Sequence, residues 1–278
     1  MGVHSHLVKA NEAGPKKRFG QHFLRDTGVL ERIVRWIQPA PDDLFWDLGA
    51  GDGALSTRLA EKAARLIAVE IDVDCIPTLI RALEHLENTA IVPGDMLQLD
   101  FSELASRYQE PARKMRFAGN LPYNIATAII ERLLHSRLPV QDMHFMVQLE
   151  VAQRITARPG TRQYGYLSVA CQHYADVQIG FKVSPACFVP RPKVASAMIS
   201  LRPKPGRRDP VFESKFEALA KAAFAYRRKT LENSMHRDPE LGALAHELLN
   251  RAGIQGSRRA EELSVREFEH LAQVLLDL

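Results

Sequence analysis

The chain has 278 residues, of which 46% are hydrophobic and 25% are charged. This length and composition predict one large and one smaller domain built around a sizeable apolar core. Lysine and arginine (37) slightly outnumber aspartate and glutamate (33), and the resulting formal net charge of +4 permits a polyanionic partner without requiring one.

The cysteines and the apolar segments argue against several classes of protein. The three cysteines lie far apart and form no Cys-x-x-Cys pair, which disfavours a zinc ribbon or a disulfide framework, and we expect no metal site. No apolar run is long enough to span a bilayer. The N-terminus is rich in His, Lys and Asn and lacks the apolar core of a signal peptide. We therefore expect a cytoplasmic protein without a membrane partner.

Signals for strands and helices alternate through the first part of the chain. Residues 1–15 have no periodicity and are predicted to form a flexible tail, whereas 29–37 place apolar residues on one helical face. The predicted strands that follow are 44–48, 66–70, 90–92, 115–118 and 144–147. The predicted helices between them are 54–64, 74–87 and 124–135. This alternation predicts a parallel sheet that helices cover on both faces.

The pattern changes towards the C-terminus. Two further strands are predicted at 177–183 and 195–201, and composition marks 203–210 as a linker. The remaining predicted elements are helices over 212–224, 241–252 and 265–276. We therefore predict an α/β domain over residues 16–203 and a smaller helical domain over residues 204–278.

A glycine-rich loop over 47–53 joins the first predicted strand of the sheet to a helix. Gly49 and Gly51 permit a tight turn and a close approach of a ligand to the backbone. The spacing Gly-x-Gly-x-Gly differs from the dinucleotide pattern, which seats a pyrophosphate, and a structural turn is the alternative. Glu70 and Asp95 follow the next two strands, where their carboxylates could accept from ribose hydroxyls and an adenine amine. Together these residues predict a nucleoside cofactor site that suits S-adenosylmethionine, which has no phosphate.

The motif Asn120-Leu121-Pro122-Tyr123 follows the fourth predicted strand. The exocyclic amine of adenine is a poor nucleophile because its lone pair is delocalised into the ring. The Asn120 side-chain oxygen and a backbone carbonyl near Leu121 could accept from this amine and aim its lone pair at a methyl carbon. Pro122 would restrict that carbonyl, and Tyr123 would stack on the base. The alternative is a strand-to-helix turn with an asparagine cap.

Longer segments carry more specific signals. They are Lys17–Leu24, Asp47–Gly51, Gly119–Asn124, Met143–Met146, Tyr164–Ser168, Phe188–Val194 and Phe224–Thr230. Together, in this order, they resemble the KsgA-type ribosomal RNA adenine dimethyltransferases. The resemblance implies a class I S-adenosylmethionine-dependent methyltransferase, with a Rossmann-like, seven-stranded, mostly parallel sheet and a small C-terminal α-helical domain.

The resemblance also implies a substrate and a product. Four methyl groups would pass to the N6 amines of two adjacent adenosines in the 3′-terminal hairpin of 16S ribosomal RNA. The RNA would be part of the small (30S) ribosomal subunit or its precursor, and the enzyme would have a role in subunit biogenesis. S-adenosylhomocysteine would be released, and we expect the chain to act as a monomer.

Residue roles follow from the same resemblance. With Gly51 of the glycine loop added, the cofactor-binding residues would be His22, Leu24, Gly49, Gly51, Glu70, Asp95 and Asn120. The catalytic group would comprise Asn120, Leu121, Pro122, Tyr123 and Phe188. Phe188 would form a second aromatic wall opposite Tyr123, although it could instead be a core residue before a proline turn. The chain departs from the family pattern at His22, where Asn is commoner, and at Arg191, where Pro is frequent.

Basic residues gather on both sides of these motifs. Between Arg191 and Lys229 there are eleven basic and three acidic residues. The candidates for RNA phosphate contacts are Lys17, Arg18, Arg191, Lys193, Arg227, Arg228 and Lys229. On a helix the last three would not share one face, so only one or two would touch RNA at once. Solvated charged faces are the alternative.

Other functions stay open at this point. A large-subunit RNA methyltransferase of the antibiotic-resistance type, or a DNA adenine methyltransferase, would share the fold and the chemistry. The DNA enzymes usually carry Asp-Pro-Pro-Tyr in place of Asn-Leu-Pro-Tyr. A ribosome-assembly factor with secondary methylation is a further possibility, whereas the glycine spacing disfavours an NAD-dependent dehydrogenase.

Overall fold

The computed structural model describes residues 21–108, 114–206 and 209–278. The predicted tail over 1–15 and the basic residues Lys17 and Arg18 lie outside the described residues.

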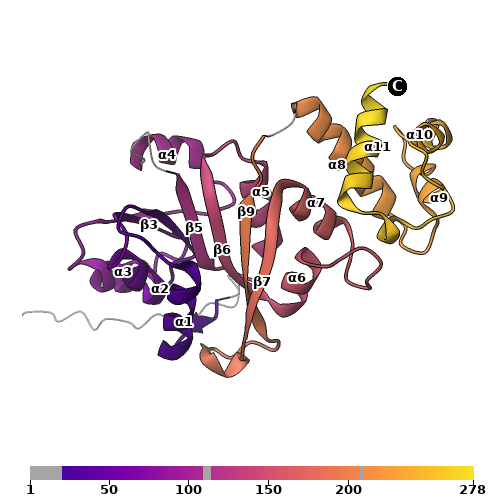
Figure 1. The fold of residues 1–278 in the computed structure, drawn as a ribbon. Helices are drawn as coiled ribbons and strands as arrows, with labels where there is room; N and C mark the ends of the chain where they lie inside the picture. The colour runs from indigo at the N-terminus through magenta and orange to yellow at the C-terminus, as the bar shows by residue number, and fades with distance from the viewer. Residues whose placement is uncertain (1–20, 109–113, 207–208) are drawn as a thin grey trace, which may run out of the picture.

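At the centre of the described part lies a seven-stranded sheet in the order β4-β3-β2-β5-β6-β9-β7 (Figure 1). Its strands are β2 Leu44–Leu48, β3 Arg65–Glu70, β4 Thr89–Pro93, β5 Met115–Asn120, β6 Val140–Gln148, β7 Ala175–Val183 and β9 Ser196–Pro203. Paired strands are parallel, except that β9 runs antiparallel to both β6 and β7. The predicted mostly parallel, seven-stranded sheet is therefore confirmed.

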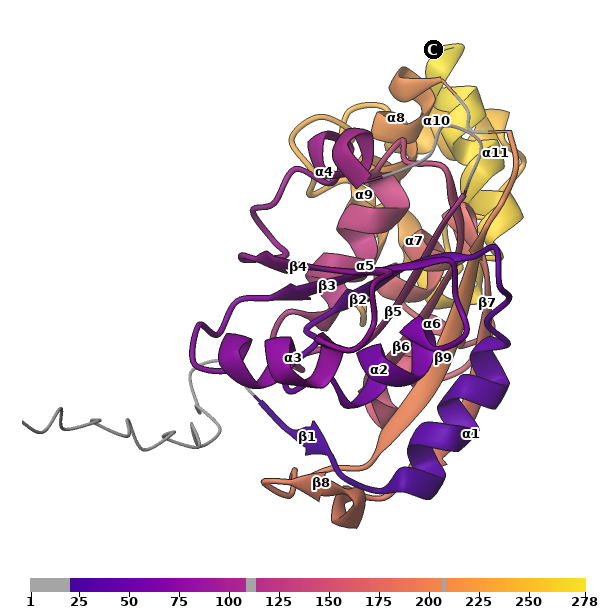
Figure 2. The same cartoon turned by 90° about the vertical axis from the view of Figure 1, so that its left-hand side faces the viewer.

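Helices cover both faces of the sheet (Figure 2). One face carries α1 Thr27–Ile37, α2 Ala54–Ala60 and α3 Ile76–Leu83. The other face carries α4 Phe101–Tyr108, α5 Ala126–His135, α6 Leu149–Ile155 and α7 Tyr166–Tyr174. Successive strand residues are therefore buried on opposite sides: Phe45 and Trp46 of β2 are both fully buried but belong to the apolar clusters of different faces.

A second, very short sheet pairs β1 Phe23–Leu24 with β8 Phe188–Val189 in antiparallel register. The 3₁₀ turn η2 Pro185–Cys187 leads into β8. This pair joins the start of the described chain to the loop between β7 and β9 (Figure 2).

The chain after β9 is helical. It forms α8 Pro210–Phe224, α9 Leu231–Met235, α10 Ala245–Arg251, the 3₁₀ turn η3 Ala260–Glu262 and α11 Val265–Leu276. These helices lie at the end of the molecule away from β1 and β8 (Figure 2). Tyr164 and Val169, which precede residue 204, share an apolar cluster with Phe216 and Leu271, so the domain division at residues 203–204 stays a prediction. Within the described ranges, no helix combines the length and apolar character needed to cross a membrane.

Several elements were not predicted from the sequence, namely α4, α6, α7, α9, β1 and β8. In α7, seven of nine residues are buried, so the helix has no polar face to reveal its period. The predicted helices over 54–64 and 74–87 end early, at Ala60 and Leu83, and continue as turns. Strand β6 begins earlier than predicted. The prediction missed its first residues because Asp142 is polar, whereas in the structure Asp142 is buried in an ion pair.

That ion pair belongs to a buried polar network around Arg116, which is 5% exposed. The guanidinium donates to both carboxylate oxygens of Asp142, at 2.8 and 2.9 Å, and also to Asp43. It further donates to the backbone carbonyls of Ile37 (2.8 Å) and Gln38 (3.2 Å). Arg116 therefore ties the C-terminal end of α1 to β5 and β6.

Replacing Arg116 by Met should destabilise the protein by about 3–5 kcal/mol, because two carboxylates would remain buried without their cation. Urea unfolding followed by circular dichroism measures this loss. Arg107→Met on α4 is the matched control: that arginine is 62% exposed and pairs with the exposed Glu103, so its loss should stay within about 0.5 kcal/mol. Equal effects of the two substitutions would contradict the role given to the network.

Candidate active site

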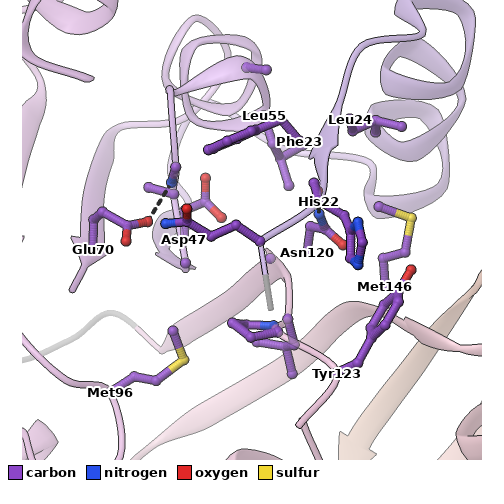
Figure 3. A pocket seen from close by; sticks show the side chains of 18 of the residues that line it. His22, Phe23, Leu24, Asp47, Leu55, Glu70, Met96, Asn120, Tyr123 and Met146 are labelled. Atoms are coloured by element: carbon purple, nitrogen blue, oxygen red, sulfur yellow. Dashed lines mark hydrogen bonds between the residues drawn. The ribbon is translucent and has the colours of Figure 1, made fainter. Parts of the chain in front are cut away.

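A cavity of about 300 Å³ opens where β2, β3, β4 and β5 end (Figure 3). Parallel strands place their carboxyl ends at one edge of a sheet, which is where ligands bind in such folds. Ten of the sequence-predicted site residues line this cavity: His22, Leu24, Gly49, Gly51, Glu70, Asp95, Asn120, Leu121, Pro122 and Tyr123. Their convergence on one cavity fits the predicted site, while the role of each residue stays a prediction.

The glycine loop forms one wall of the cavity. Gly49 and Gly51 have φ angles of 75° and 58°, in the left-handed region that side chains other than glycine rarely adopt. A Cβ atom on Gly51 would also lie 3.1 Å from a ring carbon of Phe23. The backbone N–H of Gly51 donates to Glu70 at 2.7 Å, which fixes the loop against the end of β3.

Glu70 is held rigidly at its predicted place. It is 4% exposed, and its other carboxylate oxygen accepts from the backbone N–H of Asp72 at 2.8 Å. Burial raises the pKa of Glu70, and the two backbone N–H groups offset part of that rise. A carboxylate oxygen has more than one lone-pair site, so each oxygen can still accept from a ligand hydroxyl. Asp95 is half-buried and accepts from the backbone N–H of Leu97 at 2.9 Å.

Asp47 is a buried acid to which the sequence predictions assigned no role. It lines the cavity beneath the glycine loop, is 1% exposed, and accepts from the Ser56 hydroxyl at 2.5 Å. Burial, together with the nearby charge of Glu70, raises the pKa of Asp47 to about 7. The available sequence signal was its position as an acid inside a strand that is otherwise apolar, Leu44–Leu48.

Residues 21–25, which we call the strap, run along the cavity (Figure 3). Gln21 donates to Asp72 at 2.9 Å, and Arg25 pairs with Asp52 of the glycine loop. Between these anchors, the backbone carbonyl of His22 accepts from the Asn120 side-chain nitrogen at 2.8 Å. The strap is thereby fixed to the ends of three separate strands.

The bond from Asn120 to the strap sets the orientation of its amide. A carbonyl oxygen can only accept, so the amide nitrogen must face His22 and the amide oxygen must face elsewhere. None of the described residues donates a hydrogen bond to that oxygen. Helix α5 begins at Ala126 with Ile125 at its N-cap, so Asn120 does not act as the helix cap that the structural alternative required.

Tyr123 lies at the far end of the cavity from Glu70 (Figure 3). Its hydroxyl is 2.6 Å from the Ser196 hydroxyl, and burial raises the pKa of Tyr123. The His22 ring lies beside it, with ring centroids 5.3 Å apart, and its Nδ1 donates to the carbonyl of Pro190 at 2.7 Å. His22 therefore connects the strap, Tyr123 and the loop after β8.

The placement predicted for Phe188 needs correction. Phe188 is 2% exposed, does not line the cavity, and packs in the apolar cluster of α1 and the sheet. The reason is the β1–β8 register, which sets Phe188 opposite Leu24 and directs both side chains into that cluster. In this structure the alternative given for Phe188, a core residue before a proline turn, describes it better.

The predicted basic residues that fall within the described ranges do not line the cavity. Arg191 and Lys193 are exposed in the loop between β8 and β9. Arg227, Arg228 and Lys229 are exposed too, but they form a turn after α8 and not part of a helix, so the helical-face argument does not apply. Arg227 donates to the backbone carbonyl of Arg162 at 2.8 Å. Among the described residues, no group of three or more His, Cys, Asp or Glu side chains is arranged to hold a metal.

The sheet order, the glycine loop and the acids at the strand ends define a Rossmann-like class I fold of the S-adenosylmethionine-dependent methyltransferases. The model of the ribosomal RNA adenine dimethylase family matches residues 13–277. The chain belongs to this family.

Two curated relatives carry the name ribosomal RNA small subunit methyltransferase A. That of Saccharophagus degradans is 42% identical over 264 residues, covering 94% of each chain. That of Legionella pneumophila (strain Corby) is 40% identical over 265 residues, covering 94% of this chain and 98% of the relative.

Solved structures agree on the fold. A dimethyladenosine transferase from Plasmodium falciparum superposes with a TM-score of 0.75 at 23% identity, covering 90% of this chain and 96% of that one. The 23S rRNA methyltransferase ErmE gives a TM-score of 0.67 at 25% identity, covering 91% and 99%.

The raised pKa of Asp47 predicts a pH-dependent stability that Asp47→Asn should remove. The unfolded acid ionises near its ordinary value of 3.8, whereas the folded one keeps its proton to about pH 7. Its contribution is therefore full below about pH 4 and is lost as the pH rises to 7, by roughly 1–4 kcal/mol. Urea unfolding from pH 4 to 8 measures this, and the difference between variant and parent cancels the other titrating groups. Parallel curves for the two proteins would refute the assignment.

Proposed function

We propose that the chain transfers methyl groups from S-adenosylmethionine to the N6 amines of two adjacent adenosines in the 3′-terminal hairpin of 16S ribosomal RNA. The substrate is this RNA in the small ribosomal subunit or its precursor, the expected compartment is the cytoplasm, and the chain acts as a monomer. Family membership supports the reaction class, and the orientation of the Asn120 amide is the structural observation that carries the proposal.

The cavity fits the proposed cofactor. S-adenosylmethionine would supply a methyl group bound to a positively charged sulfur. Its ribose hydroxyls need acceptors, and Glu70 offers a buried carboxylate that two backbone N–H groups already hold in place. Asp95 offers an acceptor for the adenine amine, and the left-handed glycines Gly49 and Gly51 leave the loop free of side chains.

The residues at the other end of the cavity suit a target adenine. The Asn120 amide oxygen is directed away from the strap and can accept one N–H of the target amine. A backbone carbonyl near Leu121 would accept the other, so that the nitrogen lone pair points to the methyl donor. The Tyr123 ring, held by Ser196, offers a flat surface for the base. A base that enters this cavity must leave its stack.

Two rival functions are less well supported. Curated relatives at about 40% identity are named for the small subunit, whereas the 23S enzyme is a structural neighbour at 25% identity. An assembly factor in which methylation is secondary would share the RNA-binding surface but would not need an oriented Asn120 amide. The two activities are compatible in one protein, and the first experiment below separates them.

Asn120→Ala should lower the single-turnover rate of methyl transfer about 10²- to 10³-fold, because it removes one fixed acceptor of the amine. Binding to purified, unmethylated small subunits should stay close to that of the parent. Rapid quench with tritiated cofactor measures the rate, and co-sedimentation measures binding. Asn250→Ala, at an exposed position of α10, is the matched control and should leave both unchanged. A rate equal to the parent's would rule out this role for Asn120.

The substrate assignment has its own test. Tritium from labelled S-adenosylmethionine should enter the RNA of unmethylated small subunits at two adjacent adenosines near the 3′ end, to a limit of four methyl groups. Nuclease mapping and nucleoside mass spectrometry locate and identify the label. Large subunits serve as the control, and label that appears there instead would overturn the assignment.

A further inference from the structure

The lining of the cavity also includes a group of apolar side chains, of which only Leu24 has been used so far. Five apolar side chains line the cavity and also belong to the apolar cluster beneath α1. They are Leu24, Leu30, Ile33, Met146 and Met198. We call these five residues the recess. They come from four elements, namely β1, α1, β6 and β9, and each is at most 7% exposed.

The recess begins directly beside Asn120. In the sheet register, Asn120 of β5 stands opposite Met146 of β6, and Met146 stands opposite Met198 of β9. Residues opposite each other in a sheet direct their side chains to the same face. Figure 3 shows the Met146 thioether near Tyr123 and His22, at the end of the cavity remote from Glu70. The apolar row thus starts where the target amine would lie.

The recess does not suit the charged end of the cofactor, and the cofactor contact predicted for Leu24 would be an apolar one. The methionine part of S-adenosylmethionine carries the methyl group on its sulfur, and its other end has an ammonium and a carboxylate group. Burying such charges among five apolar side chains without hydrogen-bond partners is costly. Ribose and adenine have their acceptors at Glu70 and Asp95, at the other end. A small uncharged group is what the recess fits.

Dimethylation presents such a group. After the first transfer the target amine carries one N–H and one methyl, so it can give only one of the two acceptors a hydrogen. The methyl must then take the place of one N–H, and the acceptor that this N–H served loses its partner. Apolar side chains beside that position would pack against the methyl, and methionine is the residue that best adapts its shape to one.

We propose that the recess receives the methyl group already on N6 when the second methyl is transferred, and that Met146 and Met198 thereby determine that the product is dimethylated. This inference rests on the proposed function. In the second transfer the nitrogen lone pair forms the new N–C bond, and the C–S bond breaks with its electron pair going to sulfur. The remaining N–H proton then leaves to water, which gives neutral N6,N6-dimethyladenosine.

Filling the recess should separate the two transfers. Met198→Phe narrows it from β9, one strand away from Met146, and Ile33→Phe narrows it independently from α1. With unmethylated small subunits, each variant should keep the first transfer within about threefold of the parent and slow the second at least about tenfold. N6-methyladenosine would then accumulate. Met198→Leu, which nearly conserves volume, is the matched control and should give the dimethylated product.

The readouts exclude a merely structural effect. Nucleoside mass spectrometry of timed samples gives the ratio of mono- to dimethyladenosine at equal extents of methylation, which general misfolding would not change because both transfers would slow alike. Calorimetry should give a cofactor affinity equal to that of the parent, and thermal melts identify whichever filled variant folds like the parent. The inference is overturned if that ratio stays at the parent's value in the folded variants, or if cofactor affinity falls together with the rate. Should the parent itself leave small-subunit RNA unmethylated, the proposed function fails first.

Discussion

The hydrogen bond from the Asn120 amide to the His22 carbonyl is the constraint on which the candidate site depends. It joins the end of β5 to the strap, and it turns the amide oxygen away from the strap carbonyl. An amide that could rotate would offer a donor as often as an acceptor. Because the strap carbonyl can only accept, the amide oxygen is fixed as an acceptor before any ligand enters.

At the end of the cavity remote from Tyr123, the important feature is the electrostatic state of two buried acids. Two acids, Asp47 and Glu70, lie under the glycine loop at 1% and 4% exposure. Glu70 has two backbone N–H donors, so its charge is partly compensated, whereas Asp47 has the Ser56 hydroxyl and a raised pKa of about 7. The pair therefore need not carry two full negative charges near neutral pH, which reduces their mutual repulsion.

Much of the fold and of the cavity could be predicted from the sequence, because short apolar strands and left-handed glycines such as Gly49 leave local signals. The strap bond could not, since it links Asn120 to a backbone atom 98 residues earlier in the chain. Phe188 was misplaced for a similar reason: its direction follows from pairing with Leu24 in a two-residue strand, which no periodicity can reveal. Helix α7 was missed because its burial on nearly all sides removes the alternation on which such predictions depend.

The lining of the cavity thus has a polar part and an apolar part, which differ in how much their side chains can move. Its polar part is held by short hydrogen bonds between backbone and side chain, which suits the aiming of a lone pair that must point in one direction. Its apolar part contains Met146 and Met198, whose flexible side chains can change shape to pack against a methyl group. An enzyme that acts twice on one nitrogen needs both properties, because the acceptors must stay in place while the neighbouring volume changes.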